Sequence, residues 1–155
     1  MIDIRELKQD EYYKITETLL DNNTIISMES GGSSMFPTIK AGEKLLVQTK
    51  FFKDLTKGDI VVRRMNGKLI AHRVVGYEND SIITQGDNSF KRDFLMYKDD
   101  YIGLVIGKNK AGEYLYFTSF RFCLVRYFYV NFGLITRIVG RFCHKSNRLV
   151  SRLQK

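Results

Sequence analysis

The 155-residue sequence has few cysteines and no apolar run at its start, and each shortage excludes a class of protein. It contains two cysteines, one proline and no tryptophan. Cys123 and Cys143 lie 20 residues apart, which matches no zinc or redox motif and is too little for a disulfide scaffold. The first 22 residues contain nine charged side chains and no apolar run, so we expect neither a signal peptide nor a spanning helix there.

Acidic residues are absent from the C-terminal part of the chain. Residues 1–113 carry 17 basic and 17 acidic side chains, whereas residues 114–155 carry eight basic and none acidic. The whole net charge of +8 therefore lies in the tail, and a local basic excess indicates an anionic partner. We expect two regions, a catalytic domain over residues 1–113 and a basic tail over residues 114–155.

The tail has the pattern of a basic amphipathic helix from about Phe120 to Leu153. On a helical wheel one arc is basic and the opposite arc is apolar. The longest stretch without charge is ten residues, Tyr127–Thr136, against the ~20 that a spanning helix needs. We therefore expect a peripheral helix on an anionic membrane surface, at the cytoplasmic face. An ordinary core helix with one polar side remains an alternative, and nucleic acid is disfavoured because it does not require the apolar arc.

The region before the tail has the texture of a mainly β domain. Spacings of three and four residues predict a short amphipathic helix over Ile4–Leu20. Runs rich in Val, Ile and Leu, separated by turn residues, then predict strands. They cover Thr24–Met28, Lys44–Thr49, Asp59–Arg64, Leu69–Tyr77, Ser81–Gln85 and Tyr101–Gly107.

Asn66-Gly67 predicts a two-residue hairpin with positive φ at both turn positions. The hairpin would pair the strand Asp59–Arg64 with the strand that carries His72. That histidine would then stand on a rigid element and not on a loop.

The segment Gly31–Ile39, GGSSMFPTI, contains the candidate nucleophile Ser34. A serine hydroxyl needs a base within hydrogen-bond reach and backbone that can approach a substrate carbonyl closely. The glycines supply that freedom, and Pro37 fixes the turn that follows. Taken alone, the same letters would describe a flexible Gly/Ser loop.

His72 is the candidate general base, because an imidazole can accept the serine proton at neutral pH and return it to a leaving amine. A lone histidine on an apolar strand is otherwise more often structural. Asp87, in the sequence QGDNS, could hold the imidazole tautomer and stabilise the imidazolium. Asp93 could share that role or anchor the loop, and we expect Asp87 to be the primary partner.

The ordered segments GGSSMFPTI, AGEKLLVQ, KGDIVV, AHRVVG and GDNSFKRD resemble the boxes of the type I signal peptidase and self-cleaving repressor superfamily of serine proteases. The resemblance covers about residues 30–107. It implies a coiled sheet or partly closed barrel, with Ser34 as nucleophile, His72 as base and Asp87 and Asp93 as the two aspartates. Histidine at the base position resembles the endoplasmic-reticulum, archaeal and spore-former type.

The resemblance also points to oxyanion and substrate-binding positions around the nucleophile, namely Gly32, Ser33, Met35 and Pro37. Many signal peptidases have a hydroxyl two residues before the nucleophile, where this chain has Gly32. The backbone N–H of Ser34 would then carry most of the oxyanion task. We expect no cofactor and no metal.

We therefore expect a signal-peptidase-like serine endopeptidase that cleaves a leader or signal segment of a peptide precursor after small residues. The substrate would bind as an extended added strand. Two alternatives stay open: a self-cleaving regulator of the same fold, and a membrane or nucleic-acid binding module that has lost catalysis.

Overall fold

A computed structural model describes residues 18, 24–110, 112–117 and 127. The helices predicted over residues 4–20 and 120–153 lie almost entirely outside these residues. Within the described part of the chain, no helix is long and apolar enough to cross a membrane.

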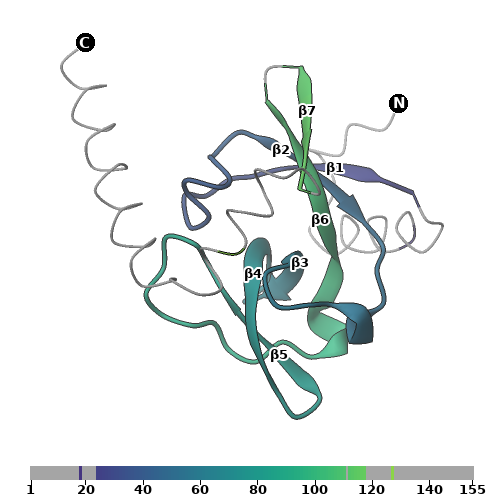
Figure 1. Cartoon of the computed structure of the whole chain (residues 1–155), viewed down its shortest axis with the longest axis vertical. Coiled ribbons are helices and arrows are strands. Elements are labelled where there is room, and N and C mark those ends of the chain that lie inside the picture. Colours follow the sequence, from purple (N-terminus) through teal and green to yellow (C-terminus); the bar gives the residue numbers. More distant parts are fainter. Residues whose placement is uncertain (1–17, 19–23, 111, 118–126, 128–155) are drawn as a thin grey trace.

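The described residues form a mainly β fold, as the sequence predicts, and every strand pair is antiparallel (Figure 1). Two short 3-10 helices, η2 (Phe52–Asp54) and η3 (Lys98–Asp100), lie between strands. The strands are β1 (Ile26–Glu29), β2 (Lys44–Gln48), β3 (Ile60–Met65), β4 (Lys68–Glu78), β5 (Ser81–Gln85), β6 (Tyr101–Lys110) and β7 (Glu113–Tyr116).

The strands form one open sheet in the order β1-β2-β6-β3-β4-β5, with β7 paired to β6. Among the described strands, β1 and β5 end this order and do not pair with each other, so the sheet is not closed into a barrel. Register shifts interrupt three of the pairings, in β2, β3 and β4. Such irregularities bend a strand and increase its local twist.

β7 was not predicted from the sequence, and three of its four residues, Tyr114–Tyr116, were assigned to the tail. It pairs with β6 from Gly107↔Tyr116 to Lys110↔Glu113. The N–H of Phe117 then donates to the carbonyl oxygen of Ile106 at 2.8 Å, and the side chain of Phe117 packs against the core. The predicted boundary after residue 113 therefore falls inside β7, and the sheet continues to Tyr116.

Apolar side chains cover both faces of β3, which explains its unbroken run Ile60-Val61-Val62. Ile60 and Val62 belong to one core cluster with Met35 and Ile39 of the segment Gly31–Ile39, which we call the serine loop. Val61 belongs to a second cluster on the opposite face, with Val74 of β4. Burying each such side chain contributes about 1.5–3 kcal/mol, so the centre of the sheet is a rigid platform.

The predicted hairpin between β3 and β4 is confirmed. Asn66 and Gly67 have φ of 51° and 68°, and the pairing runs from Met65↔Lys68 to Ile60↔Arg73. This register places His72 opposite Val61, a residue with no exposed surface. The candidate base therefore stands on the best-buried part of the sheet.

Candidate active site

Ser34 lies in a tight turn between β1 and β2. The N–H of Phe36 donates to the carbonyl oxygen of Ser33 at 3.1 Å, and the N–H of Ile39 donates to that of Met35 at 2.9 Å. Met35, Phe36 and Ile39 are buried, whereas Ser34 is exposed. Pro37 follows a cis peptide bond. The buried side chains hold the turn against the core while the hydroxyl of Ser34 faces solvent.

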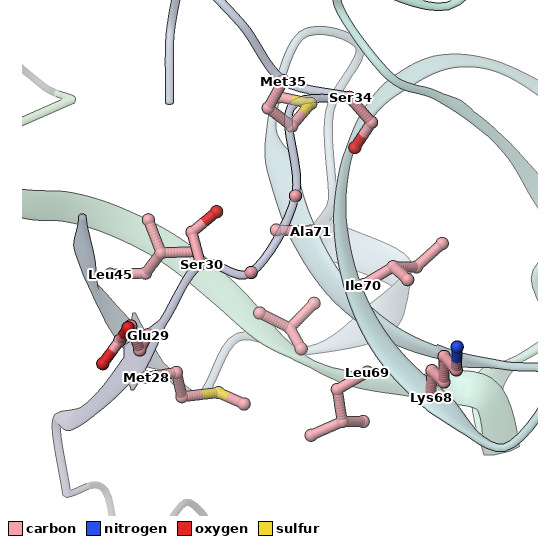
Figure 2. A pocket seen from close by; sticks show the side chains of 13 residues that line it. Met28, Glu29, Ser30, Ser34, Met35, Leu45, Lys68, Leu69, Ile70 and Ala71 are labelled. Atoms are coloured by element: carbon pink, nitrogen blue, oxygen red, sulfur yellow. The ribbon is translucent and has the colours of Figure 1, made fainter. Parts of the chain in front are cut away.

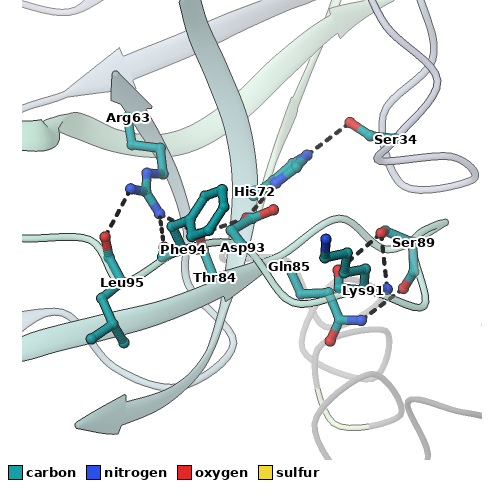
Figure 3. A network of polar contacts seen from close by, with 10 residues as sticks. All are labelled: Ser34, Arg63, His72, Thr84, Gln85, Ser89, Lys91, Asp93, Phe94 and Leu95. Carbon is teal, nitrogen blue, oxygen red and sulfur yellow. Dashed lines mark hydrogen bonds and ion pairs between the residues drawn. The ribbon is translucent and has the colours of Figure 1, made fainter. Parts of the chain in front are cut away.

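Ser34, His72 and Asp93 form a chain of contacts (Figure 3). The hydroxyl oxygen of Ser34 lies 2.9 Å from Nε2 of His72. Nδ1 of the same ring lies 2.6 Å from Oδ2 of Asp93. The side chains of His72 and Asp93 are each 9% exposed, so the pair is shielded while the serine remains accessible. A serine, an imidazole and a carboxylate in this order could act as nucleophile, base and orienting group.

The structure places Asp93, and not Asp87, against His72, which corrects the expected order of the two aspartates. Asp87 is 2% exposed and is engaged elsewhere. Its Oδ1 accepts from Nε of Arg73 at 2.7 Å and its Oδ2 from Nη2 of Arg73 at 2.6 Å. Because His72 and Arg73 are neighbours on a strand, their side chains point to opposite faces, and each face receives one aspartate.

Backbone hydrogen bonds fix Asp93 beside β5. Its N–H donates to the carbonyl oxygen of Thr84 at 2.9 Å, and Met96 exchanges two hydrogen bonds of 2.9 Å with Ile82. The segment from Asp93 to Met96 thus lies along β5 like an added strand. The carboxylate is held by a paired backbone as well as by its own contacts.

The turn Gly86–Asn88 is hydrogen bonded to the serine loop. The N–H of Asn88 donates to the carbonyl oxygen of Ser34 at 2.7 Å, and the side-chain amide of Asn88 donates to that of Ser33 at 3.3 Å. A Cβ at Gly86 would lie 2.7 Å from the carbonyl oxygen of Ser34 and 3.1 Å from Nε2 of His72. Glycine is therefore required where the three segments meet.

Buried charges support the serine loop from behind. The hydroxyl of Thr38 donates to Oδ2 of Asp87 at 2.6 Å, and the carbonyl oxygen of Thr38 accepts from Nζ of Lys108 at 2.7 Å. The same ammonium lies 2.7 Å from Oε2 of Glu43. Thr38 therefore joins two buried ion pairs and fixes the chain four residues after the nucleophile.

A groove of about 460 Å³ opens beside Ser34 (Figure 2). One wall is β1 and the glycines that follow it, and the other is the first half of β4, residues 68–71. Gly32 and Met35, two of the expected oxyanion and substrate-binding positions, line the groove. Ser33 and Pro37 are not among its lining residues; Ser33 instead offers its carbonyl oxygen to Asn88.

Both walls of the groove are strand edges. Among the described strands, β1 pairs only with β2, and β5 pairs with β4 only from Arg73 onward. The backbone of residues 68–72 therefore has a ladder on one side only, with β3. An extended peptide could form backbone hydrogen bonds with either edge.

Ser34 is the candidate reactive group of the groove. Over residues 24–110, no three His, Cys, Asp or Glu side chains gather as a possible metal site. Ser34 lines the groove, and its hydroxyl connects the groove to the imidazole of His72 and the carboxylate of Asp93. They are suited to nucleophilic attack with proton transfer.

The sequence interpretation missed the groups that support the two aspartates. Arg63, Thr84, Arg73, Thr38, Lys108 and Glu43 are all buried. One signal was present, because Arg63 and Arg73 lie within apolar strand segments, and a buried guanidinium needs acceptors. Those acceptors lie on loops distant in sequence, so their identity could not be read from spacing.

Comparison with known proteins agrees with this geometry. No curated protein shows a match to the chain. The model of the family described as Peptidase S24-like matches residues 2–106, about two thirds of the sequence. It supports the wider superfamily that the ordered boxes resemble, and a serine peptidase fold. The chain, with its exposed serine at the end of a groove between two strand edges, belongs to the Peptidase S24-like family.

Proposed function

We propose that the protein is a serine endopeptidase in which Ser34 is the nucleophile, His72 the general base and Asp93 the orienting carboxylate. The observation that carries the proposal is the continuous contact from the Ser34 hydroxyl through both ring nitrogens of His72 to Asp93. The resemblance of the sequence to signal peptidases supports a leader or signal segment of a peptide precursor as the substrate.

In the first step the Ser34 oxygen forms a bond to the scissile carbonyl carbon, and its proton passes to Nε2 of His72. The carbonyl oxygen becomes an oxyanion. When the C–N bond breaks, His72 returns the proton to the leaving amine, which leaves an acyl-enzyme. Water then attacks the ester, with His72 again taking and returning one proton, and restores Ser34.

Charges around His72 favour this proton transfer. Oδ2 of Asp93 lies 2.6 Å from Nδ1, so a carboxylate faces the imidazolium as it forms. Nη2 of Arg63 lies 3.7 Å from Oδ2 of Asp100, and Arg63 with the two aspartates leaves one net negative charge beside a neutral ring. Protonation of His72 offsets that negative charge, so the charges around the ring favour the imidazolium as it forms.

The backbone amide of Ser34 is the oxyanion donor in this proposal. Among the described residues, no acceptor is hydrogen bonded to this N–H, whereas the carbonyl oxygen of Ser34 is held by Asn88. The hydrogen bond from Asn88 fixes the carbonyl group of Ser34. The N–H of Ser34 stays available to donate to the substrate oxygen as it becomes an oxyanion. Gly32, two residues earlier, lines the groove and leaves room for the substrate carbonyl.

The substrate binds as an extended strand between β1 and residues 68–71 of β4. Backbone hydrogen bonds to the two edges provide affinity that does not depend on sequence, and the side chains that line the groove select the residues near the cut. Gly31, Gly32 and Ala71 line the wall together with apolar Met28, Leu45 and Leu69. This lining suits a leader peptide with small or apolar residues before the cleaved bond.

The C-terminal tail places the enzyme at an anionic membrane surface in this proposal. Its support is the sequence alone: eight basic residues and no acidic residue after residue 113, with an apolar arc opposite the basic one. Each basic residue near an anionic leaflet contributes ~1 kcal/mol. The tail would thereby concentrate the enzyme where leader peptides partition.

The test is covalent labelling by a fluorophosphonate, with Ser34→Ala and His72→Ala as matched variants. We expect the wild type to be labelled, Ser34→Ala to be unlabelled, and His72→Ala to lose labelling and peptide cleavage about as severely, because the two groups act as one unit. Folded wild-type protein that resists the label would refute catalysis and favour a binding module. A cleavage rate independent of protein concentration would instead identify a self-cleaving regulator.

A further inference from the structure

We propose that Arg63 and Thr84 are positioning residues for the catalytic carboxylate: Thr84 fixes the oxygen of Asp93 that faces His72, and Arg63 fixes the backbone that presents it. The inference rests on the proposed function and adds two residues that the nucleophile, base and acid arrangement does not specify.

Two donors converge on the same oxygen of Asp93 (Figure 3). The hydroxyl of Thr84 donates to Oδ2 at 2.7 Å, and Nδ1 of His72 lies 2.6 Å from that atom. A carboxylate held by one donor can rotate about its terminal torsion, which is broad. With two donors from different strands on one oxygen, its position is defined by β4 and β5 together.

Arg63 holds the next layer of the same network. Its Nη1 donates to the hydroxyl oxygen of Thr84 at 3.2 Å and to the carbonyl oxygen of Phe94 at 2.7 Å. Its Nη2 donates to the carbonyl oxygen of Leu95 at 3.1 Å. Because the Thr84 oxygen accepts from Arg63, its own proton is directed to Asp93, and the two residues after Asp93 are tied to β3.

The sheet register explains why these groups meet. Arg63 pairs with Ile70, Val61 with His72, and Thr84 with Val74. Paired residues and residues two apart share a face, so Arg63, His72 and Thr84 lie on one face of three adjacent strands. Arg63 is 2% exposed and Thr84 has no exposed surface. The network is therefore rigid and closed to water.

If Arg63 only filled space in the core, its donors would not need to point at particular oxygen atoms. Burial lowers the pKa of Arg63, and the negative charges of Asp100 and Asp93 act in the opposite direction. A buried guanidinium is a costly way to fill space, while a planar fork can hold several oxygen acceptors in fixed directions. Here the acceptors are a threonine oxygen and the two carbonyls that follow Asp93.

The experiment compares Thr84→Val with Thr84→Ser in the full chain. Valine matches the shape of threonine but lacks the donor, and serine keeps it. We expect Thr84→Val to lower kcat by about 10- to 100-fold with KM nearly unchanged, and Thr84→Ser to stay within a few-fold of wild type. Arg63→Met should give a similar loss in kcat and Arg63→Lys a smaller one, with the folded fraction measured in each.

A second readout does not depend on turnover. The His72 Nδ1 proton, bonded to Asp93, should give a far-downfield proton NMR signal, and Thr84→Val should shift or broaden it while Thr84→Ser preserves it. Thr38→Val, which removes a hydroxyl bonded to Asp87, should leave this signal in place. Equal kcat and an unchanged signal in folded Thr84→Val would overturn the inference. An inactive wild type would overturn the proposed function alone, since the NMR comparison would still decide the positioning role.

Discussion

His72 and Arg73 are adjacent on β4, yet their faces of the sheet serve opposite purposes. On one face, the imidazole of His72 contacts Asp93 through one ring nitrogen and the exposed Ser34 through the other. On the other face, the guanidinium of Arg73 forms a bidentate ion pair with Asp87, and both residues are buried. The two aspartates are six residues apart on one loop.

The difference lies in what each carboxylate faces. A guanidinium is a fixed cation in proteins, so the buried contact of Arg73 with Asp87 is suited to holding structure. An imidazole, unlike a guanidinium, is a side chain that can exchange protons in catalysis, so the contact of His72 with Asp93 is suited to the proposed proton transfer. We call the Arg73–Asp87 pair the clamp and the His72–Asp93 pair the candidate catalytic pair.

The same loop connects the clamp and the catalytic pair. Asp87 is tied to Arg73 and Thr38, Asn88 holds the carbonyl of Ser34, and Asp93 reaches His72. The clamp therefore defines where the loop starts and the catalytic contact defines where it ends. Substitutions on the two sides should separate stability from turnover.

Asp93→Asn should have the largest effect on activity. The amide keeps the shape but cannot stabilise the imidazolium and can favour the wrong ring tautomer, so kcat should fall by up to ~10⁴-fold. The melting temperature should change little. Peptide cleavage and thermal unfolding of the same preparation give both values. Near-normal cleavage by a folded Asp93→Asn protein would contradict its role and return the site to a serine and histidine dyad.

Gly86→Ala should come next, because it strains the meeting point of the two sides. The new methyl would lie 2.7 Å from the Ser34 carbonyl oxygen, which is backbone and cannot move cheaply. We expect about a 100-fold loss in kcat from displacement of the serine loop. Gly76→Ala is the matched control, since its Cβ would meet only Ile83 at 3.7 Å. Equal activity of the two variants would contradict the close approach.

Asp87→Asn should act mainly on stability. It leaves the buried guanidinium of Arg73 without its carboxylate, which costs about 3–5 kcal/mol of unfolding free energy. The remaining folded protein should retain a substantial part of its kcat, unlike Asp93→Asn. Denaturant unfolding measures the loss, and the double variant Asp87→Leu with Arg73→Met should recover part of it. Loss of kcat as deep as that of Asp93→Asn, in stable protein, would mean that the clamp also orients His72.

Much of the fold was predictable because the apolar runs and the turn residues between them indicated the same strands. The strands over residues 44–49, 59–64, 69–77 and 81–85 were expected within one or two residues, and the Asn66-Gly67 turn set the register that carries His72. β7 was missed because its residues, Glu113-Tyr114-Leu115-Tyr116, are exposed and continue into a basic tail. Nothing in that short segment separates an edge strand from the start of a helix.

The choice between Asp87 and Asp93 was not predictable from spacing, because both lie on irregular backbone. The neighbour of His72 offered the missing signal. Since Arg73 interrupts an apolar run and must point away from His72, it needs a carboxylate of its own. Two aspartates on the next loop then serve two partners, although the sequence leaves open which aspartate reaches which partner.

Removal of the tail should have the smallest effect on the site. A chain that ends after Phe117 keeps β7 and the contact of Phe117 with the core, whereas one that ends near Tyr114 would cut the strand. We expect the longer truncation to keep the cleavage rate on a soluble peptide and to lose flotation with anionic vesicles, which the full chain should show at low salt. Neutral vesicles are the control, since the tail carries basic and no acidic side chains. A full chain that stays at the bottom with anionic vesicles, or a truncated chain that floats equally well, would contradict the membrane role while leaving the serine site untouched.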